Sequence, residues 1–147
     1  MPPSLVNYYW ENLHDNNGEK KSAYDSIYNC IAFVAGLKIT KMWPIKEDGY
    51  YWPDGFPLEE SVENFINTFR KAYGYELCES NSLESGYEKI ALYVKENEPT
   101  HMAKQLHNGK WISKLGSYED IEHNSPEVLN GRAYGEAAYF MRRVINE

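Results

Sequence analysis

The sequence predicts a single α+β domain in which N-terminal helices pack on an antiparallel sheet. Three observations lead to this fold class. The chain has 147 residues, about the length of one domain with one hydrophobic core. Apolar residues recur at helical spacing in the first half and alternate as in strands in the second half. No run is long enough to act as a linker, so residues 1–147 are expected to form one unit.

Two helices are expected before residue 75. The first is short and buried and begins near Cys30, because the stretch "YNCIAFVAGL" places Ile31 and Val34 on one face. The second lies in "PLEESVENFINTFRKAYG", where Phe65 and Phe69 share a face with Val62 and Ile66. Acids occupy its first turn, and Gly74 is the expected stop.

The segment between these helices, residues 41–57, predicts an ordered loop. It holds three prolines, two glycines and several aromatic residues, "KMWPIKEDGYYWPDGFP". Its rings, among them Trp43 and Trp52, either pack as a cap on the core or wall a binding cleft.

Strand patterns follow residue 74. "YELC" and "EKIALYV" (88–94) are strand candidates, and "THMAKQL" with "WISKLG" form a hairpin closed at Asn108-Gly109. The segment "EAAYFMRRVI" fits a last strand or a helix, and its alanine-rich composition leaves both open.

Composition excludes several classes of function. The net charge of −7 and the lack of a clustered Lys/Arg surface argue against nucleic-acid binding. No run approaches the roughly 18 apolar residues of a membrane span, and the N-terminal residues show no secretory signal. We therefore expect a cytoplasmic protein with reduced thiols, or one delivered by a leaderless secretion route.

One pair of residues could carry covalent chemistry. A cysteine at a helix N-terminus is favoured as the thiolate nucleophile, and the same backbone N–H groups could stabilise an oxyanion. Cys30 holds that position, and His101, at the start of a strand, is the candidate general base. The alternative is structural: a lone buried cysteine usually packs, and His101 alone reads as a surface histidine. Cys78 is expected to be structural.

No metal ion or other cofactor is expected. His101, His107, His123 and Cys30 are potential zinc ligands, but no paired short spacing of metal ligands occurs. Phosphate-binding glycine loops are absent from the sequence as well.

The order "NCIAFVAG", "EKIALYV" and "HMAKQLHNGKWISKLG" resembles the core of the papain-like cysteine hydrolases, especially the compact bacterial branch of cell-wall amidases and peptidases. That resemblance implies a papain-like core in which Cys30 attacks, His101 transfers the proton and Ser113 is the third residue. The family's usual oxyanion glutamine is missing, so Asn29 or backbone amides would take its place. The whole chain also resembles a family of small, mostly uncharacterised bacterial proteins with the skeleton YNC, YWP, EK-ALY, TH, W-SKLG and IEH.

The register of the hairpin decides which residue can orient His101. With a two-residue Asn108-Gly109 turn, Ser113 faces away from His101, and Met102 and Trp111 lie on one face of the hairpin. A three-residue turn that includes His107 puts Ser113 on the His101 face. His123 is a further candidate, although the acids around it also fit a solvated turn. We expect Trp52 and Trp111 to line the cleft.

These observations predict a papain-like cysteine hydrolase that cleaves a peptide, amide or related acyl bond, of the kind a bacterial effector would use. Two alternatives remain. One is a non-catalytic acidic protein of the immunity type that binds a basic protein, because net charge −7 steers association with cationic surfaces. The other is an acyltransferase that uses the same two residues.

Overall fold

The computed structural model describes residues 19–20, 30–36, 41–114, 120–131 and 134–145. The helices are α2 (Cys30–Ala35), α3 (Val62–Tyr73) and the short 3-10 helix η1 (Pro126–Leu129). The strands are β1 (Glu19–Lys20), β2 (Lys41–Met42), β3 (Tyr50–Tyr51), β4 (Glu76–Cys78), β5 (Tyr87–Lys95), β6 (Glu98–Gln105), β7 (Trp111–Lys114), β8 (Asp120–His123) and β9 (Glu136–Val144).

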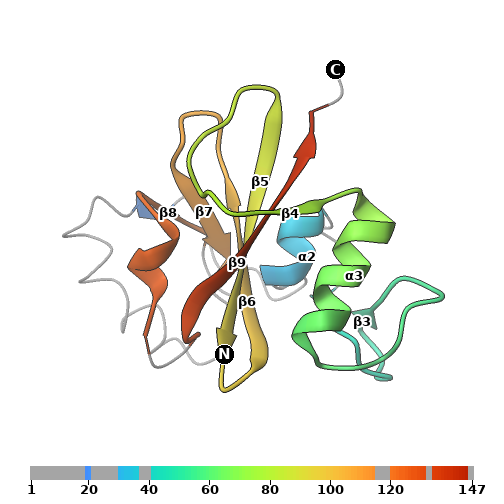
Figure 1. The fold of residues 1–147 in the computed structure, drawn as a ribbon. Helices are drawn as coiled ribbons and strands as arrows, with labels where there is room; N and C mark the ends of the chain where they lie inside the picture. The colour runs from blue at the N-terminus through green and yellow to red at the C-terminus, as the bar shows by residue number, and fades with distance from the viewer. Residues whose placement is uncertain (1–18, 21–29, 37–40, 115–119, 132–133, 146–147) are drawn as a thin grey trace.

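The sheet dominates the fold, which is mixed α+β. Seven strands pair in the order β1-β8-β7-β6-β5-β9-β4, and every neighbouring pair is antiparallel. Figure 1 shows α3 near the β4 end of this sheet and η1 near β8 at the other end. The expectation of helices first and strands second needs correction, because β1 precedes α2 and pairs with β8. The open question about the C-terminal segment is answered, since β9 is a strand between β5 and β4.

Helix α3 is where the sequence predicts it, and its ends explain why. The Ser61 side chain accepts a hydrogen bond from the Asn64 backbone N–H at 3.1 Å, which caps the N-terminus. Gly74 ends the helix in the left-handed conformation at φ 80°. Phe65 and Phe69 are buried, so the apolar face packs into the core as expected.

Removing this cap gives a measurable prediction. Ser61→Ala is expected to lower the free energy of unfolding by about 1 kcal/mol, because the Asn64 N–H loses its partner. Urea denaturation measures the loss. Ser85→Ala, which changes an exposed serine, is the control. Equal midpoints for the two variants would contradict the role of Ser61.

The β6–β7 hairpin has the three-residue turn. Gln105 pairs with Trp111, and the Leu106 N–H donates to the Lys110 carbonyl at 2.7 Å. His107, Asn108 and Gly109 therefore form the turn, and Gly109 takes the left-handed backbone at φ 86°. As a result Ser113 lies on the same face of the sheet as His101.

Each face of the sheet has its own core. The first core joins helices α2 and α3 to one face of the sheet; its buried members include Cys30, Ile31, Phe65, Phe69, Ile90, Leu92, Met102 and Met141. The second core lies on the other face beneath η1; its members are Ala91, Tyr93, Ala103, Trp111, Ile121, Leu129 and Tyr134. Residues that alternate along β5 and β6 thus divide between the two cores.

The segment around His123 is a strand and not a solvated acidic turn. Glu122 and His123 belong to β8, which pairs with β7 on one side and β1 on the other. Both side chains are buried, at 6% and 0% exposure.

None of the helices in the described ranges has the length and apolar character needed to cross a bilayer.

Candidate functional site

Cys30 begins α2, as the sequence predicts, but its sulfur is enclosed. The residue is 5% exposed and belongs to the first core with Ile31 and Met102. Burial raises the pKa of the Cys30 thiol to about 11, although nearby backbone N–H groups and the charge of Lys114 act in the opposite direction. At neutral pH this group is therefore a protonated thiol.

His101 lies on the opposite face of the sheet. It pairs with Tyr93 across β5 and β6, and its ring stacks on Tyr134 at a centroid distance of 4.2 Å. Tyr93 and Tyr134 are members of the second core, whereas the next residue, Met102, belongs to the first core with Cys30.

The structure therefore does not bring Cys30 and His101 together. Successive side chains of a strand point to opposite faces, so a strand that turns Met102 toward α2 turns His101 away from it. The apolar pattern decides this phase, because Met102 continues the row of buried residues that cover the helices. The expectation of a shared crevice for the sulfur and the imidazole needs this correction.

The other two candidate residues, Ser113 and His123, contact each other. The Ser113 Oγ and His123 Nε2 are 2.8 Å apart, and His123 Nδ1 is 2.7 Å from the Ser125 carbonyl. A carbonyl only accepts, so Nδ1–H donates to Ser125 and Nε2 accepts from the Ser113 hydroxyl. Burial lowers the pKa of His123 to about 4, so the ring is neutral at neutral pH.

His101 is neutral for the same reason. Its side chain is fully buried, and burial together with the nearby His123 lowers its pKa well below 6.5. Neither ring nitrogen has a hydrogen-bond partner in the described part of the chain. Ser113 and His123 thus share a face with His101 but bond to each other, and the thiol is on the other side.

The expected cleft residues do not line one cleft. Trp52 belongs to the first core and packs on Phe65 at 5.1 Å, whereas Trp111 belongs to the second core. Trp52 is buried against Phe65, which favours the interpretation that the rings of residues 41–57 pack as a cap on the core. Asn29 lies outside the described residues.

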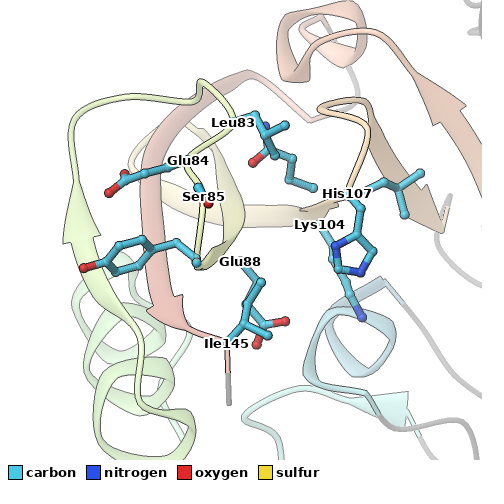
Figure 2. Close-up of a pocket in the computed structure, with 11 residues that line it drawn as sticks. Leu83, Glu84, Ser85, Glu88, Lys104, His107 and Ile145 are labelled. Atoms are coloured by element: carbon cyan, nitrogen blue, oxygen red, sulfur yellow. The ribbon is translucent and has the colours of Figure 1, made fainter. Parts of the chain in front are cut away.

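A groove opens at the end of the sheet, away from all these residues. It has a volume of about 1040 Å³ and lies between residues 83–88 and residues 104–107. Figure 2 shows Glu84 and Ser85 on one side, Lys104 and His107 on the other, and Glu88 and Ile145 between them. A second hollow of about 450 Å³ shares Glu88 and Ile145, so the two adjoin.

A different surface carries most of the net charge. Residues 47–63, here called the acidic segment, contain six acids and no Lys, Arg or His, which gives a formal charge of −6 against −7 for the whole chain. The six acids are all exposed: Glu47, Asp48, Asp54, Glu59, Glu60 and Glu63. None of them forms an ion pair with another residue in the described ranges. Two large apolar side chains of the segment, Tyr51 and Leu58, are also exposed, at 43% and 55%.

Aromatic packing fixes the acidic segment on the first core. Trp43 and Trp52 both contact the Phe65 ring, at centroid distances of 5.2 and 5.1 Å. The Trp43 indole N–H also donates to Glu60. The segment therefore presents its charges from a firm support beside α3, at the lower right of Figure 1.

Within the described residues, no group of three or more His, Cys, Asp or Glu side chains is arranged to hold a metal ion.

A family model with the description "Domain of unknown function (DUF7689)" matches residues 19–142. The chain belongs to DUF7689. Comparisons with curated proteins and with solved structures give no match. The match spans the candidate residues from Asn29 to His123 and the whole acidic segment, so these features lie within the DUF7689 domain.

Sequence reasoning missed the groove and undervalued the acidic segment. The groove of the DUF7689 domain combines residues as far apart in sequence as Leu83 and Ile145, and no local motif marks such a site. The acidic segment does have a signal: 17 consecutive positions carry six acids and no base.

Proposed function

We propose that this protein is a non-catalytic binding protein that recognises a positively charged partner protein through the acidic segment. The observation that carries the proposal is the set of six exposed carboxylates without ion-pair partners in the described structure. Some acids elsewhere are paired with bases: Glu84, for example, contacts Arg142 and Lys89, at 2.5 and 3.3 Å. Unpaired charge of one sign at one site steers association with a partner of the opposite sign.

Exposed apolar groups support a specific contact in the same place. Tyr51 and Leu58 lie among the carboxylates, and an aromatic ring with an aliphatic neighbour is a common anchor at protein interfaces. The segment is held by Trp43 and Trp52, so binding costs little ordering of the chain. This arrangement supports the immunity-type or acidic binding role.

The matched-charge experiment compares two variants that each lose four negative charges. The first replaces Asp48, Asp54, Glu59 and Glu63 by the corresponding amides. The second replaces Glu79, Glu96, Glu98 and Glu136, four exposed acids outside the acidic segment, in the same way. Binding of a labelled peptide of alternating lysine and leucine is measured by fluorescence anisotropy at several salt concentrations.

The first variant is expected to bind the peptide roughly tenfold or more weakly and with a smaller salt dependence, because several ion pairs are lost at once. The second is expected to bind nearly as the unmodified protein does. Equal losses in the two variants would mean that net charge alone attracts the peptide, which would contradict a binding surface at residues 47–63.

The papain-like hydrolase implied by the resemblance, and the related acyltransferase, are the alternative proposals. Both need a reactive thiolate at Cys30 and an imidazole within reach of it. The raised pKa of Cys30 and the position of His101 on the other face count against them.

A further inference from the structure

We propose that the groove at the end of the sheet binds an extended acidic peptide segment of a partner protein, with an apolar side chain next to a carboxylate. This site differs from the acidic segment and takes ligands of the opposite charge. In Figure 1 the start of β5, where the groove opens, lies toward the top, and the acidic segment lies at the lower right.

The size and the apolar lining fit a peptide side chain. The main hollow has about 1040 Å³ and adjoins the hollow of about 450 Å³ beside the end of α3. Both volumes are in the range of ligand-binding clefts. Leu83, Leu106 and Ile145 line the main hollow, and Leu83 is 53% exposed. Covering such a leucine with an apolar side chain is favourable.

The wall that carries Leu83 is fixed in place. It belongs to the loop between β4 and β5, where the Ser80 and Asn81 carbonyls accept hydrogen bonds from Lys89 and Gln105, both at 3.0 Å. The Asn81 side chain also donates to Glu127 next to the second core, at 3.0 Å. A groove with a fixed wall can bind a peptide without first ordering itself.

The charges of the groove favour an acidic ligand. Its two carboxylates are already paired with arginines: Glu84 with Arg142, and Glu88 with Arg143. Two donors are unused by other residues in the described ranges: the ring of His107 in the main hollow and the Nη2 group of Arg143 in the adjoining hollow. Lys104 adds a positive charge beside His107 (Figure 2). A carboxylate of the ligand can accept from these donors, whereas a basic peptide would meet like charge.

The test uses a labelled peptide of alternating glutamate and leucine, titrated with the full chain. We expect saturable binding, with Leu83→Asp and His107→Glu each weakening it roughly tenfold or more. Each variant has a matched control. Leu77→Asp changes an equally exposed leucine on β4 outside the groove, and Lys110→Glu reverses a charge on the same hairpin outside the groove. Both controls are expected to bind as the unmodified protein does.

Three results would overturn the proposal. One is failure of the glutamate peptide to bind saturably. Another is equal weakening by the groove variants and their controls. The third is self-association in sedimentation that Leu83→Asp and Leu58→Asp both abolish, which would assign the groove to the acidic segment of a second copy. Failure of the lysine peptide to bind residues 47–63 leaves this test unaffected, because the two experiments use different peptides and different variants.

Discussion

Between neutral pH and about pH 4, the protein is expected to lose about 3 kcal/mol of its free energy of unfolding through His123 alone. Burial lowers the pKa of His123 from 6.5 in the unfolded chain to about 4 in the native state. The unfolded chain therefore takes up a proton that the native state excludes. The stability from this group is complete above pH 6.5 and is lost as the pH falls toward 4.

His101 acts in the same direction. Burial and the neighbouring His123 lower its pKa well below 6.5, so the native state excludes a second proton. The ring contacts Tyr93 and Tyr134 and has no hydrogen-bond partner in the described structure, so a buried imidazolium there would lose its hydrogen bonds to water without replacement. Urea denaturation at a series of pH values measures the combined loss.

Two variants separate the histidines from the carboxylates that also titrate in acid. His101→Phe keeps an aromatic ring against Tyr134 but removes the titrating group, so stability should fall less steeply with acid than in the unmodified protein. His107→Gln changes the exposed histidine of the turn and should leave the pH profile unchanged. Parallel pH profiles for His101→Phe and the unmodified protein would contradict a buried neutral His101.

The sequence predicted the elements that local chemistry specifies. Helix α3 lies where the sequence places Phe65 and Phe69 on one face and a stop at Gly74, and these signals depend only on neighbouring residues. Strands β5 and β6 appear where apolar residues follow the strand period. The C-terminal strand β9 could not be separated from a helix, because its pairing with β5 and β4 depends on distant segments.

The structure separates Cys30 from His101 because of the phase of strand β6, that is, which of its side chains face α2. His101 and Met102 are neighbours, and a strand that shifts by one residue exchanges the faces of both. The resemblance to papain-like hydrolases requires His101 to face α2, whereas the buried row of Leu92 and Met102 requires the opposite. The hydrophobic term outweighs the resemblance, because Leu92 and Met102 bury their side chains against the helices in this phase. The imidazole of His101 is buried on the other face.

The thiol of Cys30 is expected to react with iodoacetamide at least about a hundredfold more slowly than a model thiol near neutral pH. A pKa of about 11 in place of 9.0 lowers the thiolate fraction by that factor, and 5% exposure slows the reagent further. Cys78, which is only partly buried, provides a second thiol in the same chain for comparison. Mass spectrometry of the Cys78→Ser and Cys30→Ser variants follows each thiol separately, and unfolding in urea should expose Cys30 fully.

His101→Ala decides between the packing role and the catalytic role of Cys30. A general base next to the sulfur would raise its reactivity, so loss of that base would slow alkylation. With the imidazole on the other face of the sheet, His101→Ala should not slow it, and a looser second core could only speed it. A fast reaction of Cys30 that slows on this substitution would mean that the two groups meet in solution, and the hydrolase would then replace the binding protein as the better account. A slow reaction that His101→Ala does not slow further leaves Cys30 as a packing residue, because a protonated, enclosed sulfur can neither attack a carbonyl nor hold an acyl group.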